Sequence, residues 1–137
     1  MSAADIENIR ARYEAVDAGD RSVLFQDVHP GFTLQTPDRV PNAGTYLGAE
    51  EATRFMQDFW APFEEVRVEC REFAEQGDRV AVRLRVRSRH KGSSAFVEIN
   101  VAVVWTMRDG KPIRAEMYPE PEKAFEAIGA GERPQAN

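Results

Sequence analysis

Three side chains of this sequence could transfer protons or hydrogen-bond a substrate, and they lie far apart along the chain. His29 precedes Pro30 and could act as a general base, because an imidazole titrates near neutral pH; it could also be a turn or capping residue. Tyr13 could contact a ligand oxygen, or it could be a core tyrosine satisfied by a backbone carbonyl. Glu116 would be a base only if the register of its strand turned it inward. The chemistry to consider is therefore proton transfer.

Other reaction classes are disfavoured by what the sequence lacks. Its two histidines are far apart and no cluster of His and Cys residues occurs, so no zinc or iron site is expected. A Gly-x-Ser-x-Gly elbow, a phosphate loop and a dinucleotide fingerprint are missing as well. Cys70 has no identifiable histidine partner for nucleophilic catalysis. We therefore expect no metal and no cofactor.

Composition limits the partners and the compartment of this 137-residue chain. A net charge of −5 argues against a nucleic-acid partner, because such binding depends on an excess of Lys and Arg. A single cysteine excludes an intrachain disulfide, which fits a reducing compartment. The first residues lack the basic and apolar regions of a signal peptide, and no apolar run approaches the roughly 18 residues that span a bilayer. We expect a cytoplasmic protein that binds no nucleic acid and no membrane.

Helical spacing of apolar side chains predicts four helices. Gly19 is suited to cap the first of them, while Pro30 and Pro62 stand beyond the ends of the next two. The predicted helices cover residues 4–18, 20–25, 50–60 and 121–128.

Alternation of apolar and polar side chains predicts six strands. Short turns such as Asp109-Gly110 require antiparallel pairing of the long ones. We predict one α+β domain over residues 1–129, with its helices on one face of the sheet, and a loose tail over residues 130–137. The predicted strands cover residues 32–36, 45–47, 65–73, 79–87, 96–107 and 112–118.

Four segments in order resemble one known superfamily. They are residues 11–20, the strand ending in Thr36-Pro37, residues 45–52 and the hairpin at residues 108–113. Together they resemble the nuclear transport factor 2-like superfamily, in its SnoaL-like branch. The resemblance implies a curved antiparallel β-sheet wrapped on N-terminal helices, forming a cone with an internal cavity. It implies little chemistry, because the superfamily includes ketosteroid isomerases, polyketide cyclases, epoxide hydrolases, dehydratases and binding proteins.

Residue by residue, the chain departs from the steroid isomerases of that superfamily. Tyr13 matches their tyrosine on the first helix, which donates to the substrate oxygen. Thr36 stands before Pro37 where they carry an aspartate base, and a threonine hydroxyl cannot accept a proton near pH 7 without a base of its own. Val103 stands at or near their second acid and can neither donate nor ionise. The isomerase mechanism is therefore not expected, nor is the Arg and paired-Asp site of the epoxide hydrolases.

The cavity implied by the resemblance would be mainly apolar. Val101, Val103 and Trp105 alternate along one arm of the hairpin and Met117 lies on the other, so its inner face is water-free. Aromatic side chains could line the cavity mouth or serve only in packing. Gln35 would face away from the cavity unless a bulge reversed it. The candidate ligand-binding residues are Gln35, Thr36, Tyr46, Phe55, Phe59, Trp60, Val101, Val103, Trp105 and Met117.

Arginines occupy every second position from Arg83 to Arg89. In line they could bind an anionic surface, but acids on neighbouring strands, among them Glu69 and Glu98, favour a ladder that is solvated or faces a second copy. Members of the superfamily are often homodimers packed through the outer sheet face. The resemblance therefore implies a homodimer.

Two functions from different classes remain open. The first is a cofactor-independent isomerase, cyclase or hydrolase that acts on a small hydrophobic molecule by proton transfer. In it Tyr13 would orient a substrate oxygen, with His29, Glu116 or Gln35 assisting. The second is a non-catalytic protein that binds a hydrophobic ligand or serves as an accessory dimeric module. The resemblance favours the first function, and the missing acids favour the second.

Overall fold

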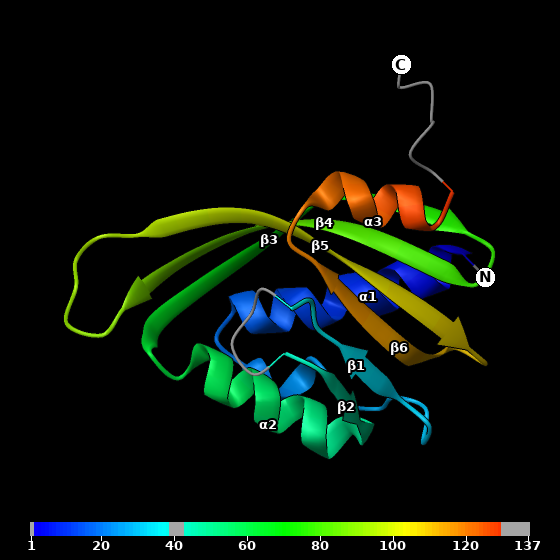
Figure 1. The fold of residues 1–137 in the computed structure, drawn as a ribbon, viewed down its shortest axis with the longest axis horizontal. Helices are drawn as coiled ribbons and strands as arrows, with labels where there is room; N and C mark the ends of the chain where they lie inside the picture. Colours follow the sequence, from blue (N-terminus) through cyan, green and yellow to red (C-terminus); the bar gives the residue numbers. More distant parts are fainter. Residues whose placement is uncertain (1, 39–42, 130–137) are drawn as a thin grey trace.

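The computed structural model describes residues 2–38 and 43–129, and within them a single curved sheet is covered by helices on both faces (Figure 1). The predicted tail at residues 130–137 lies outside the described residues. The helices are α1 (Ser2–Asp17), α2 (Gly48–Trp60) and α3 (Pro121–Ala127), with a turn of 3-10 helix, η1, at Arg21–Val23. The strands are β1 (Thr33–Gln35), β2 (Thr45–Leu47), β3 (Phe63–Gln76), β4 (Arg79–His90), β5 (Val97–Arg108) and β6 (Lys111–Tyr118).

The predicted α+β class is confirmed, with one correction to the pairing of the strands. The order across the sheet is β2-β1-β6-β5-β4-β3 and the sheet is open. All neighbours are antiparallel except β1 and β6, which run parallel. That pair joins strands about 80 residues apart in the sequence, so no short turn constrained its direction. Expecting an entirely antiparallel sheet was therefore wrong at this pair.

The β5–β6 hairpin fixes the register of the inner face. Its turn residues, Asp109 and Gly110, have φ values of 54° and 80°. Two successive residues with positive φ are what a tight hairpin requires, and Asp and Gly tolerate that conformation better than most residues. The resulting register sets Trp105 opposite Ala115 and Val103 opposite Met117.

Helices cover both faces of the sheet, so the prediction that they gather on one face is wrong for α3. Helices α1 and α2 lie against the concave face, and α3 lies on the convex face (Figure 1). The convex side of β5 carries Ala102 and Val104, which pack with Phe125 of α3 in a separate buried cluster. Small apolar side chains at alternate positions were the sequence signal for this second contact.

The two halves of β5 differ in coverage. Val103 and Trp105 are buried in the main core, whereas Val97 and Ile99 are 52% and 47% exposed. The end of the β4–β5 hairpin extends beyond α1 and α3 (Figure 1). The apolar stripe of the concave face therefore reaches the surface at this end of the sheet.

No helix within the described residues is long and apolar enough to cross a membrane.

Candidate functional site

A cavity of about 220 Å³ lies between the concave face of the sheet and α1, α2 and the segment that follows η1. Side chains from both helices and from most of the strands line it. Because Ile99 is among them and is also half exposed, the cavity reaches solvent beside the first half of β5. Tyr13 and Trp105 carry polar atoms into this otherwise apolar wall; Tyr118 also borders it, although its ring packs toward α3 on the other face.

The strand register explains why the wall is apolar. On β4 and β5, alternate side chains face the same way, and the antiparallel register sets Leu84 opposite Val101 and Val86 opposite Ile99. These four side chains all border the cavity. Tyr13 reaches the cavity from α1, on the helix face that also buries Ile9 and Val16.

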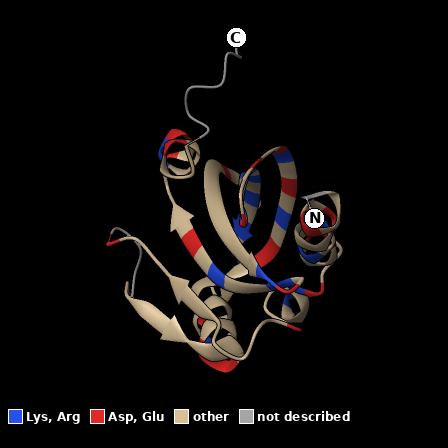
Figure 2. Cartoon of the chain, turned by 90° about the vertical axis from the view of Figure 1, so that its right-hand side faces the viewer, with Lys and Arg blue, Asp and Glu red and all other residues tan. Residues whose placement is uncertain are grey.

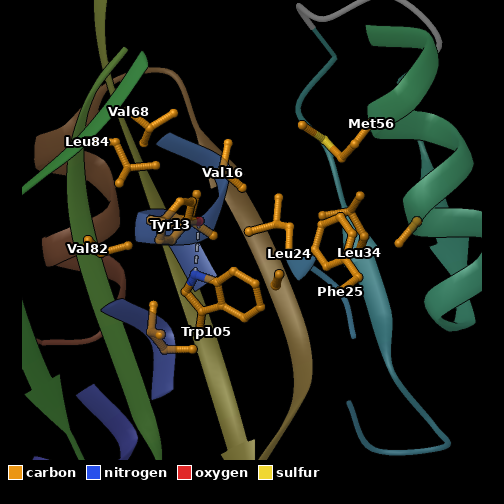
Figure 3. Packing of buried hydrophobic residues seen from close by; sticks show 14 of the residues in the cluster. Tyr13, Val16, Leu24, Phe25, Leu34, Met56, Val68, Val82, Leu84 and Trp105 are labelled. Carbon is orange, nitrogen blue, oxygen red and sulfur yellow. Dashed lines mark hydrogen bonds between the residues drawn. The ribbon is translucent and has the colours of Figure 1, made fainter. Parts of the chain in front are cut away.

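Tyr13 and Trp105 form a hydrogen-bonded pair inside the core. The indole Nε1–H of Trp105 donates to the Tyr13 hydroxyl oxygen at 3.2 Å, and the rings meet edge to face with centroids 6.0 Å apart (Figure 3). Burial raises the pKa of Tyr13 well above its ordinary value, and the indole bond opposes this only in part. The hydroxyl is therefore neutral at physiological pH.

The Tyr13 hydroxyl is a donor that lacks an acceptor within residues 2–38 and 43–129. Its oxygen accepts from the indole, while no hydrogen bond from its own proton is found among the described residues. A phenolic hydroxyl both accepts and donates, so half of its capacity is unused. In an apolar wall, that proton is available to a ligand oxygen.

Arg12 holds the loop that supplies another part of the wall. Its buried guanidinium donates to the carbonyl oxygens of Leu24 at 3.0 Å, Gln26 at 2.5 Å and Asp27 at 3.3 Å. Burial lowers the pKa of Arg12, and the Asp27 carboxylate opposes this. The contacts fix the segment that presents Leu24 and Phe25 to the cavity.

His29 does not border the cavity. Its Nδ1 accepts from the Gly31 N–H at 2.9 Å, and its own backbone N–H donates to the Pro112 carbonyl at 2.8 Å. These bonds are those of a turn residue, the alternative interpretation of its position beside a proline. We therefore leave His29 out of the site that we propose.

Glu116 lies on the convex side of β6. It is opposite Val104, which packs under α3, and its carboxylate pairs with Arg114 at 3.1 Å. The register has not slipped, since Met117 and not Glu116 borders the cavity. Gln35 is exposed and accepts from Arg114 at 2.6 Å. Neither of these polar side chains reaches the cavity.

Thr36 is occupied by the connection between β1 and β2. Its hydroxyl donates to the Gly44 carbonyl at 3.1 Å and accepts from the Gly44 N–H at 2.8 Å. Among the described residues, the cavity wall thus contains no Asp, Glu, His, Lys or Arg side chain.

The candidate ligand-binding residues fall into two groups. Phe55 stacks on Phe59 with ring centroids 5.8 Å apart, and Tyr46 meets Phe55 at a tilted angle with centroids 4.7 Å apart. Of these three rings only Phe59 borders the cavity, so Tyr46 and Phe55 lie behind the wall. Sequence reasoning missed Leu24 and Phe25, because a helix was predicted over residues 20–25, whereas the structure has only a turn of 3-10 helix at Arg21–Val23. The candidates that do line the cavity are Phe59, Trp60, Val101, Val103, Trp105 and Met117.

Neither Cys70 nor a cluster of metal-ligating side chains supplies a reactive group to the cavity in the described part of the chain. Burial raises the pKa of the Cys70 thiol to about 11, so it is not a thiolate near pH 7, and Cys70 does not border the cavity. No group of three or more His, Cys, Asp or Glu residues that could hold a metal occurs within residues 2–38 and 43–129.

Solved structures share this fold over nearly the whole chain. TerC co-crystallised with polyporic acid is 28% identical, with a TM-score of 0.74 and 91% of this chain and 97% of that chain covered. A nuclear transport factor 2-like protein from Burkholderia pseudomallei K96243 is 21% identical, with the same score and coverage. A putative SnoaL-like polyketide cyclase from Jannaschia sp. CCS1 is 20% identical, with a TM-score of 0.72 and 93% of each chain covered.

No curated protein matches the sequence significantly. The model of the SnoaL-like domain, in contrast, matches residues 9–115. This range runs from α1 to β6 and holds Tyr13, Trp105 and most of the cavity wall. The superfamily predicted from the sequence is confirmed, and the chain belongs to the SnoaL-like domain family.

Proposed function

We propose that this protein binds a small, largely apolar molecule in its cavity through one acceptor oxygen. The observation that carries the proposal is the unused proton of the buried Tyr13 hydroxyl. An apolar wall with one well-placed polar group is typical of small-molecule sites, where the polar group fixes the orientation of the ligand. Because Tyr13 is neutral, a carbonyl oxygen suits it better than a cation does.

The orientation of the ligand follows from the shape of the cavity. Its oxygen would lie at the buried end, against Tyr13, and its apolar part would extend along Leu84 and Val101 toward Ile99, where the cavity opens. Binding of an organic molecule by TerC, as its co-crystal with polyporic acid describes, supports this kind of ligand.

Two rigid tricyclic probes that differ at one position test the proposal. Fluorenone has a carbonyl where fluorene has a methylene group, so their affinities isolate the hydrogen bond. We expect wild-type protein to prefer fluorenone by about fivefold, since a net hydrogen bond is worth about 1 kcal/mol. Tyr13→Phe should abolish the preference with little change in fluorene affinity, as measured by calorimetric titration. Equal affinities in the wild type, or a preference that survives Tyr13→Phe, would rule out this function.

Catalysis of proton transfer by a SnoaL-like isomerase, cyclase or hydrolase is the second candidate. The same hydroxyl favours it, because a donor at a substrate carbonyl stabilises the negative charge that develops when a neighbouring proton leaves. Since the described wall holds no general base, that proton would pass to solvent at the cavity mouth. Deuterium incorporation into 2-tetralone, followed by mass spectrometry, tests this: catalysis requires faster exchange with the wild type than with Tyr13→Phe.

A homodimer through the convex sheet face is a separate part of the proposal. Basic and acidic residues are interspersed along the long strands (Figure 2), and on the convex face Arg85 pairs with Glu98 at 3.0 Å and with Glu69 at 3.6 Å. Such a neutralised face could contact its own copy without charge repulsion. Light scattering should give twice the 15.5 kDa chain mass, and Arg87→Glu should reduce it, whereas Arg54→Ala on α2 should not. A monomeric wild type would exclude the dimer.

The cytoplasmic location stays a prediction.

A further inference from the structure

We propose that Trp105 is a positioning residue, which makes Tyr13 a hydrogen-bond donor toward the cavity. The indole Nε1–H is a donor only, and it occupies the acceptor side of the Tyr13 oxygen. The hydroxyl proton is thereby directed away from the indole. This inference rests on the proposed function, because it assumes that Tyr13 meets a ligand oxygen.

The indole is held in place more firmly than the hydroxyl that it orients. Trp105 is 1% exposed, and Phe25 and Phe32 lie against its ring with centroids 6.0 Å and 6.5 Å away. Its backbone is fixed between Val80 of β4 and Ala115 of β6. A phenolic hydroxyl, in contrast, can rotate about its C–O bond, so a fixed donor beside it is needed to select one orientation.

The bond also couples Trp105 to the ligand. When a hydroxyl donates to a carbonyl, its oxygen becomes a better acceptor, and the hydrogen bond that it receives strengthens. A ligand with a carbonyl at Tyr13 should therefore strengthen the bond from Trp105, although the indole never touches the carbonyl. A matched ligand without the carbonyl should leave that bond unchanged.

Nuclear magnetic resonance of the indole N–H groups detects this coupling in the intact wild-type protein. The chain has two tryptophans, so Trp60→Phe assigns the signals. We expect saturation with fluorenone to move the Trp105 N–H proton further downfield than saturation with fluorene does. In Tyr13→Phe the two probes should give the same shift. Equal shifts in the wild type would overturn the inference.

A second test compares two core variants. Trp105→Phe removes the indole donor, while Phe125→Leu removes a buried aromatic ring from the convex cluster, away from the cavity. We expect Trp105→Phe to reduce the fluorenone preference to less than about twofold, because the freed hydroxyl no longer favours one orientation. Phe125→Leu should retain the wild-type preference even if both variants lose similar stability.

The outcomes separate this inference from the proposed function. If Tyr13→Phe loses the preference for fluorenone and Trp105→Phe keeps it in full, Tyr13 binds the ligand without help from Trp105 and the inference is wrong. If the wild type shows no preference for fluorenone over fluorene, the proposed function itself is wrong. If Trp105→Phe does not fold, the indole shifts of the wild type decide the question.

Discussion

The concave and convex faces of β4 and β5 share the same backbone but use their polar groups differently. On the convex face, Arg83 pairs with Glu72 at 3.0 Å and with Glu122 at 2.7 Å, and Arg89 pairs with Glu64 at 3.2 Å. On the concave face, the buried Tyr13 hydroxyl keeps a proton that has no acceptor among the described residues. Charge on one face is neutralised within the fold, whereas the neutral donor on the other is available to a ligand.

The largest expected effect is a loss of stability from a change on the convex face, without an effect on the concave face. Phe125→Ala should lower the free energy of unfolding by about 3–5 kcal/mol, because it empties the buried cluster under α3. The preference for fluorenone over fluorene should not change, since that cluster lies across the sheet from the cavity. Urea unfolding and calorimetric titration measure the two quantities. A loss of the preference would show that the faces are not independent.

Arg12 uses its hydrogen bonds within the fold and should therefore contribute to stability and not to the choice of ligand. Arg12→Ala should cost about 2–4 kcal/mol, because it leaves the carbonyls of Leu24, Gln26 and Asp27 without their donor. Both probes should bind less tightly by the same factor, since Leu24 and Phe25 lose their support. A selective effect on fluorenone would instead give Arg12 a direct part in recognition.

Tyr13→Phe should, in contrast to Arg12→Ala, weaken the binding of fluorenone selectively. It leaves the buried Trp105 indole N–H without its acceptor, so the free energy of unfolding should fall by about 1–3 kcal/mol. Thermal unfolding measures the loss of stability, and it is compared with the loss of fluorenone affinity. A large loss of stability with unchanged fluorenone binding would make Tyr13 structural.

The smallest expected effect concerns an ion pair at the edge of the sheet. Hydrogen bonds from Arg67 and from the Val68 N–H hold the pKa of Asp17 below its ordinary value. Its contribution to stability is therefore complete above the ordinary pKa of about 4 and is lost as the pH falls through the lowered value. Asp17→Asn should be less stable than the wild type at pH 7, and the difference should shrink under acid. A difference independent of pH would exclude the carboxylate as its cause.

Local patterns predicted most of the fold because they report local geometry. Alternation located β3 to β6, and Asp109-Gly110 marked the turn that sets the register between β5 and β6. The parallel contact of β1 with β6 was missed because it joins distant segments and has no turn of its own. The place of α3 was missed because the side chains that face it, Ala102 and Val104, are small. The larger apolar side chains at the alternate positions predicted burial of the other face.

The site was predictable only in part. Helical spacing placed Tyr13 on an apolar face and alternation placed Trp105 on another, but no pattern links two residues 92 positions apart. The polar candidates His29, Gln35 and Thr36 were reasonable by residue type, yet the structure uses each in a turn or a strand contact. Chemistry-bearing residue types could be read from the sequence, whereas their free hydrogen-bonding capacity depends on tertiary contacts.

The carbonyl stretch of bound fluorenone in the infrared spectrum tests the central claim most directly, because it reports the hydrogen bond itself. With wild-type protein, the band should lie at lower frequency than in a hydrocarbon solvent, and with Tyr13→Phe it should return to the hydrocarbon value. A band at the hydrocarbon frequency in the wild type, or the same low frequency in both proteins, would contradict the assignment of Tyr13 as the ligand's hydrogen-bond donor.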